Sequence, residues 1–173
     1  MLRKILLGKR PNPYIKYTNG AVSKYVLKTK TLSGNENVNT NFKPFNGGNW
    51  ELHLIAYFPS SENQRMATIL NAMDESNTNY NGFCIRKSSS SQTKIYYGES
   101  SAALSDTDDL DVTIRYVDGT ITVLYGEESL SFEANYNVEN LTILIGSSID
   151  NPANGTYYRY AIATIKHFSI KSL

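Results

Sequence analysis

The sequence predicts an all-β fold in which two antiparallel sheets pack face to face as a β-sandwich. The chain contains 18 Asn, 18 Ser and 14 Thr beside 13 Tyr, a mixture of turn-forming and strand-forming residues. Apolar side chains alternate with period two along most segments, whereas helical periodicity is scarce. The length of 173 residues suits one domain, and a hydrophobic share of 40% with a charged share of 19% is ordinary for a globular protein.

The first expected strands cover residues 24–30 and 50–58, where apolar and polar side chains alternate. One face of the second strand carries a continuous apolar set: Trp50, Leu52, Leu54, Ala56 and Phe58. Residues 66–73 fit two structures, because their apolar side chains suit one helical face and also a buried strand over residues 67–72. We expect the strand, since the segments on both sides are strand-like.

The next expected strands form a pair over residues 82–87 and 94–99, joined by a run of serines that predicts a loop. The clearest hairpin follows over residues 110–126. Its alternation reverses around the dipeptide Asp118-Gly119, which is typical of a tight turn.

The chain is expected to end in three strands, over residues 129–134, 141–146 and 157–170. A loop of Ser, Asp, Asn, Pro and Gly separates the last two of them. With the earlier segments, this gives about ten to twelve short strands, the number expected of a sandwich or jelly roll.

The charge is distributed unevenly along the chain. The formal net charge is +1, but residues 1–35 carry eight basic side chains and no acid. The rest of the chain therefore holds nine basic against sixteen acidic residues, a balance of −7. We expect a basic N-terminal arm over residues 1–20 and the sandwich over residues 21–173. The arm is expected to anchor the protein through five basic residues: Arg3, Lys4, Lys9, Arg10 and Lys16.

Composition also excludes several classes of protein. The single cysteine, Cys84, excludes an internal disulfide, and its apolar neighbours predict a buried thiol. The apolar run over residues 5–7 is too short for a signal peptide, and no segment approaches the roughly 20 apolar residues of a membrane span. We therefore expect synthesis in the cytoplasm, with no membrane partner. The negative body disfavours nucleic acid, so the arm is expected to dock on protein.

Four segments resemble a known superfamily: "NWELHLIAYF", "LDVTIRYVDGTITVLYGEESLSF", "LTILIGSS" and "YYRYAIATIKHFSI". They resemble, in order, the early strand, central hairpin, rim-loop strand and last strand of the concanavalin A-like lectin/glucanase superfamily in its laminin-G-like form. The resemblance covers residues 22–173 and implies a jelly roll. Members are mostly noncatalytic glycan- or protein-binding modules, some are polysaccharide hydrolases, and many belong to bacteriophage capsid-decorating, fibre and tail proteins.

Catalytic and metal signatures are weak. The Glu-x-Asp-x-x-Glu string of the glucanases that share this fold is absent, so we expect no enzymatic activity. One acidic loop offers carboxylates that could bind calcium, namely Asp106, Asp108 and Asp109, but it lacks the EF-hand spacing. A solvated loop is the favoured interpretation, and no cofactor is expected.

Tyrosine and asparagine side chains are the more suggestive set, because exposed Tyr and Asn suit sugar stacking with hydrogen bonding, or a protein interface. The candidate glycan- or partner-binding residues are Tyr96, Tyr97, Asp150, Asn151, Asn154, Tyr157 and Tyr158. The alternative is that they are ordinary strand and turn residues.

The sequence and the resemblance together predict a noncatalytic structural or adhesion module of a bacteriophage virion, as capsid decoration, fibre or tail protein. Its expected partners are other virion proteins or copies of itself, and a cell-surface glycan. The alternative is a stand-alone, lectin-like carbohydrate-binding module that uses its rim loops and exposed Tyr and Asn.

Overall fold

The computed structural model describes residues 14–18, 21–60, 66–74, 81–88, 92–134, 141–151 and 156–173. Side chains are described throughout these ranges except at residues 14–18, 21–23, 149–151 and 156–158. The described chain is all strand and loop, so it contains no helix that could span a membrane.

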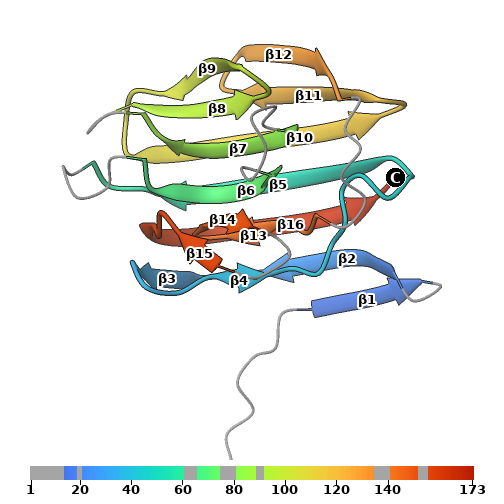
Figure 1. Ribbon diagram of the computed structural model, residues 1–173, viewed down its shortest axis with the longest axis horizontal. Helices are drawn as coiled ribbons and strands as arrows, with labels where there is room; N and C mark the ends of the chain where they lie inside the picture. Colours follow the sequence, from blue (N-terminus) through green and yellow to red (C-terminus); the bar gives the residue numbers. More distant parts are fainter. Residues whose placement is uncertain are drawn as a thin grey trace, which may run out of the picture.

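Two antiparallel sheets form the body (Figure 1). Sheet A contains, in spatial order, β1 (Tyr14–Thr18), β2 (Ala21–Leu27), β16 (Ile162–Ser172), β5 (Trp50–Tyr57), β10 (Asp109–Val117), β11 (Thr120–Tyr125) and β12 (Glu128–Glu133), and β3 (Lys30–Ser33) also pairs with β16. Sheet B contains β4 (Val38–Asn39), β13 (Leu144–Ile145), β6 (Thr68–Asp74), β7 (Asn81–Lys87), β8 (Thr93–Tyr97) and β9 (Ser100–Ser105). A separate hairpin joins β14 (Ser148–Asn151) to β15 (Thr156–Tyr158).

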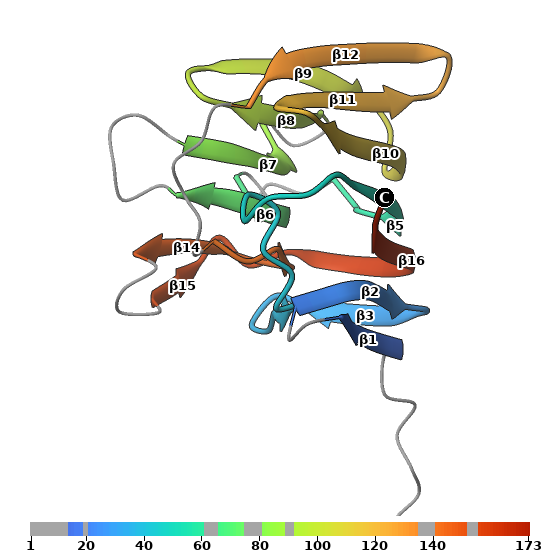
Figure 2. The ribbon, with the colours of Figure 1, turned by 90° about the vertical axis from the view of Figure 1, so that its right-hand side faces the viewer.

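Seen from the side, the sheets lie as two layers, with β6 and β7 in one and β5, β10 and β16 in the other (Figure 2). The predicted two-sheet β-sandwich is therefore confirmed, and residues 68–74 form the expected strand rather than a helix. The last strand, β16, lies inside sheet A between β5 on one side and β2 and β3 on the other.

Within the described residues, sheet A already includes Tyr14–Thr18, whereas the sequence placed the start of the sandwich at residue 21. Strand β1 pairs with β2 along its whole length, and Lys16 lies opposite Lys24. The last part of the predicted arm is therefore an edge strand of sheet A. The other predicted anchor residues, Arg3, Lys4, Lys9 and Arg10, lie outside the described residues.

The core lies between the two sheets, and its largest fully buried side chain is that of Trp50, which is 1% exposed. Its indole ring stacks on Phe83 from sheet B at 6.2 Å and on Tyr116 from sheet A at 5.9 Å. The indole N–H donates a hydrogen bond of 2.7 Å to the carbonyl oxygen of Pro44. One aromatic side chain thus joins both layers and the loop that precedes β5.

The hairpin between β10 and β11 has the predicted turn. Asp118 and Gly119 both have positive φ, 48° and 88°, as a type I′ turn requires. The right-handed twist of this turn matches that of the flanking strands.

Replacing Gly119 with alanine is expected to lower the free energy of unfolding by about 1 kcal/mol, because an L side chain rarely adopts this φ. No atom lies within 4 Å of the position that a Cβ would take, so the loss is conformational and not steric. Urea denaturation followed by circular dichroism measures it. A Gly119→Asn variant should lose less, since Asn tolerates positive φ; equal stability of all three proteins would contradict the turn assignment.

Candidate functional site

The outer face of sheet B, turned away from sheet A, holds a pocket of about 420 Å³ that we call the arginine pocket. Its lining residues are Met66, Met73, Arg86, Tyr96, Gly98, Glu99, Ser100 and Arg159. They come from β6, β7, β8, the turn after β8, the start of β9, and the segments that precede β6 and follow β15.

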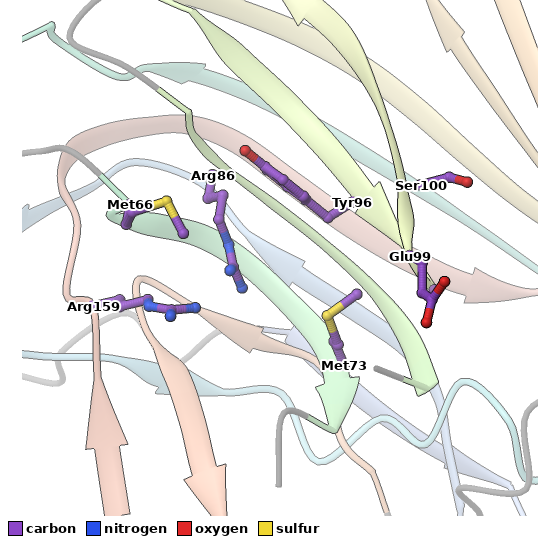
Figure 3. A pocket seen from close by; sticks show the side chains of 8 residues that line it. Met66, Met73, Arg86, Tyr96, Glu99, Ser100 and Arg159 are labelled. Atoms are coloured by element: carbon purple, nitrogen blue, oxygen red, sulfur yellow. The ribbon is translucent and has the colours of Figure 1, made fainter. Parts of the chain in front are cut away.

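Two arginines supply the positive charge of the pocket. Arg86 lies on the central strand β7 and is 5% exposed, whereas Arg159 follows the β14–β15 hairpin. The two side chains reach the pocket from different elements, and their guanidinium groups converge at one end of it (Figure 3). Guanidinium groups bind carboxylates and phosphates through two parallel hydrogen bonds, so this convergence favours a planar anion.

The backbone fixes Arg159 at the pocket. Its carbonyl oxygen accepts a hydrogen bond of 2.8 Å from the amide of Thr68, at the start of β6. Arg159 also has a positive φ of 54°, as does Met66, whose φ is 67°. Among the described residues, only two other non-glycine positions share this conformation, Asn41 and the turn residue Asp118. Such strained conformations cluster at functional sites.

Tyr96 forms the aromatic wall of the pocket. It lies on β8 directly opposite Cys84, and the guanidinium carbon of Arg86 lies 5.2 Å from the centre of its ring. Burial raises the pKa of the Tyr96 hydroxyl, and the positive charges of Arg86 and Arg159 offset part of that rise. Both cations therefore act on the same phenol group.

Two methionines add an apolar surface. Met66 lies beside Arg159, and Met73 lies between the guanidinium groups and Glu99 (Figure 3). Met73 is 2% exposed, and its sulfur lies 4.0 Å from that of Cys84, which is buried as predicted. Strands β6 and β7 approach closely here because Gly82 has no side chain: a Cβ would lie 2.0 Å from the carbonyl oxygen of Ala72.

The described lining of the pocket lacks the pair of carboxylates that most glycoside hydrolases use. Among the described residues that line the pocket, Glu99 is the only acid. It lies at the end of the pocket away from the two guanidinium groups (Figure 3). The arrangement can hold an anionic group against an aromatic and apolar wall, but it offers no second carboxylate for general acid and base chemistry.

The sequence-predicted tyrosines separate on folding. Tyr96 lines the arginine pocket, whereas Tyr97 points to the other face of β8. The ring of Tyr97 stacks on Phe132 of β12 at 4.1 Å, so this pair joins the two sheets at one end of the core. Tyr97 is therefore placed to pack the sandwich and not to line the pocket.

The predicted rim residues fall in and around the β14–β15 hairpin, which lies beside β6. Asp150 and Asn151 belong to β14, and Tyr157 and Tyr158 belong to β15. Asn154 lies outside the described residues. The backbone of this hairpin carries Arg159 to the pocket.

The acidic loop does not gather its carboxylates around one point. The carboxylate of Asp106 accepts a hydrogen bond of 2.8 Å from Gln92, and that of Asp109 forms an ion pair of 2.6 Å with Lys166. Asp108 accepts hydrogen bonds from the amide and hydroxyl of Ser60. Within the described ranges, no three His, Cys, Asp or Glu side chains are placed to hold a metal ion.

Sequence reasoning missed both arginines and both methionines of the pocket. Arg86 carried a usable signal, because it directly follows the apolar residues 83–85 in a strand expected to be buried, and a buried charged residue must be paired or functional. Arg159 carried none, since its place depends on a turn of the backbone that no local pattern marks.

The sequence matches no protein-family model and no curated protein. The fold, in contrast, is similar to solved structures. The CBM40 of the Ruminococcus gnavus IT-sialidase, bound to α2,3-sialyllactose, matches with a TM-score of 0.59 and 9% identity over 86% of this chain and 92% of that one.

Two larger proteins contain a similar domain. A mutant Trypanosoma rangeli sialidase with trans-sialidase activity matches with a TM-score of 0.52 and 13% identity, over 87% of this chain and 27% of that one. Botulinum neurotoxin type C, in a structure titled for its interaction with two ganglioside molecules, matches with a TM-score of 0.50 and 13% identity, over 93% of this chain and 48% of that one. At these identities, the similarity shows the fold alone.

Proposed function

We propose that the protein is a noncatalytic glycan-binding module whose arginine pocket holds the carboxylate of an acidic sugar. One observation carries the proposal: the guanidinium groups of Arg86 and Arg159 converge beside the ring of Tyr96. A carboxylate can accept paired hydrogen bonds from such groups, while the ring and the two methionines cover the apolar parts of the sugar.

The similarity to the CBM40 structure bound to sialyllactose supports this class of ligand, because sialyllactose carries one carboxylate on its terminal sugar. The ganglioside named for the botulinum neurotoxin structure agrees with it. These similarities favour the lectin-like alternative over a bacteriophage virion component, for which they offer no support. The role of the basic arm in docking to other proteins stays a prediction.

Titration with sialyllactose and with lactose, followed by isothermal calorimetry, tests the proposal. The protein should bind sialyllactose and should bind lactose at least about tenfold more weakly, because lactose has no anion for the arginines. Equal affinity for the two sugars, or no binding of sialyllactose, would contradict the proposal.

Arg159→Gln should weaken sialyllactose binding by about tenfold or more, since it removes one charged partner of the carboxylate. Arg159 is only partly buried, so this variant is expected to fold, which circular dichroism checks. Arg86→Gln should have the same effect on binding. The matched control is Arg115→Gln on the outer face of sheet A, where Arg115 pairs with Glu51; this change should leave affinity unaltered.

A further inference from the structure

Lys94 extends the positive charge of the arginine pocket along the outer face of sheet B. It lies on β8 directly opposite Arg86 on β7, so the two side chains project from the same face of the sheet. Tyr96, two residues further along β8, shares that face. Lys94 therefore adjoins the pocket at its Arg86 side, although it does not line the pocket itself.

The pairing of Arg86 with Lys94 is unfavourable by itself. Like charges directly opposite one another on antiparallel strands destabilise a sheet, and the cost is greater when one of them is removed from water. Arg86 is 5% exposed, and the ammonium group of Lys94 forms no ion pair with any residue in the described part of the chain.

Sheet A shows the opposite arrangement at its own cationic positions. Arg115 and Lys171 both lie directly opposite Glu51, on the two strands that flank β5. The carboxylate of Glu51 pairs with Arg115 at 2.7 Å and with Lys171 at 2.9 Å. On the outer face of sheet A an acid thus lies directly between two cations, whereas on β8 the residue directly opposite Arg86 is Lys94.

The charges at the two ends of the pocket have opposite signs. Glu99 follows β8 at the end away from Lys94, so the acid and the lysine lie on opposite sides of Tyr96 along the chain. A ligand with several anionic groups would be repelled at the Glu99 end and attracted at the Lys94 end. Its second anion therefore has one favourable direction in which to lie.

We infer that Lys94 forms a second anion subsite beside the arginine pocket, and that the protein binds glycans with acidic groups on two adjacent sugars. This inference rests on the proposed function, since the first acidic sugar occupies the arginine pocket. The second group is a carboxylate or a sulfate, because an ammonium group attracts both as a point charge.

The test compares three ligands by calorimetry at low ionic strength: sialyllactose, with one carboxylate; a disialylated lactose, with two; and a sialyllactose that carries one O-sulfate. The wild-type protein should bind at least one of the doubly charged ligands about fivefold more tightly than sialyllactose. The ligand that gains affinity identifies carboxylate or sulfate as the second group.

Lys94→Gln should abolish this gain and leave the affinity for sialyllactose unchanged. The control is Lys28→Gln, which removes the same charge from the exposed segment between β2 and β3 of sheet A and should preserve the gain. If Lys94→Gln lost affinity equally for singly and doubly charged ligands, the second subsite would be wrong. The same holds if the wild type bound the doubly charged ligands no more tightly than sialyllactose. Neither result would contradict the proposed function. Failure of all three ligands to bind overturns the proposed function and the inference with it.

Discussion

Replacing Trp50 with alanine is expected to lower the free energy of unfolding by about 4 kcal/mol, the upper part of the range for large-to-small changes in a core. The indole ring is 1% exposed and stacks on Phe83 and Tyr116 from the two different sheets. Its removal leaves a cavity between the layers that neither sheet can close without disturbing its ladder. The carbonyl oxygen of Pro44 also loses its 2.7 Å hydrogen bond.

Urea denaturation measures this loss, with circular dichroism as the signal, because Trp50 is the only tryptophan of the chain and its fluorescence disappears with the substitution. Trp50→Phe is the matched control: it keeps a stacked ring and should lose about half as much. If the alanine variant lost less than the phenylalanine variant, the ring at position 50 would not stabilise the packing of the two sheets.

The fold could be predicted because the strands of sheet A have one face in the core and one in water. The alternation over residues 50–58 reports this directly, and Asp118-Gly119 marks where the chain reverses. The start of the sheet at Tyr14 could not be predicted in the same way. Strand β1 is preceded by a basic segment, and its place at the sheet edge depends on pairing with β2, which is a tertiary contact.

The arginine pocket could not be predicted because it is built on the strands that do not alternate. Strands β6 and β7 are almost entirely buried on both faces, so their sequences do not distinguish the side that faces sheet A from the side that holds the pocket. Of the two neighbouring tyrosines predicted as binding residues, Tyr96 lines the arginine pocket, whereas Tyr97 packs against Phe132. Strand alternation puts the two rings on opposite faces of β8, but which face packs on sheet A depends on tertiary contacts.

The second large change in stability is expected at a buried lysine next to the pocket. Lys87 follows Arg86 on β7, but its side chain is 0% exposed and its ammonium group lies 3.6 Å from the carboxylate of Asp108. The same ammonium group lies 5.1 Å from the ring centre of Phe58 and 3.4 Å from the hydroxyl of Ser60. This contact ties sheet B to the segment that follows β5 in sheet A.

Asp108→Asn is expected to lower the free energy of unfolding by about 3 kcal/mol near neutral pH, because it leaves the charge of Lys87 buried without its counter-ion. The double variant Lys87→Met, Asp108→Asn should recover most of that loss, since an apolar side chain of similar length can occupy the site beside Phe58. Denaturation of the wild type, both single variants and the double variant completes a mutant cycle that isolates the charge contact. Additive losses in the cycle would show that the two groups do not interact.

The loss of stability in Asp108→Asn should also depend on pH, and the direction of that dependence follows from the surroundings of the carboxylate. Hydrogen bonds from Ser60, together with the charge of Lys87, hold the pKa of Asp108 below its ordinary value. The stabilisation is therefore complete above the pKa of the unfolded chain and is lost as the pH falls through the lower pKa of the folded state. Burial lowers the pKa of Lys87, so the lysine opposes folding while it is charged and does so less as the pH rises toward 10.5. The difference in unfolding free energy between the wild type and Asp108→Asn should consequently shrink on acidification below about pH 4. If this difference stayed constant into strong acid, Asp108 would stabilise the fold without its charge.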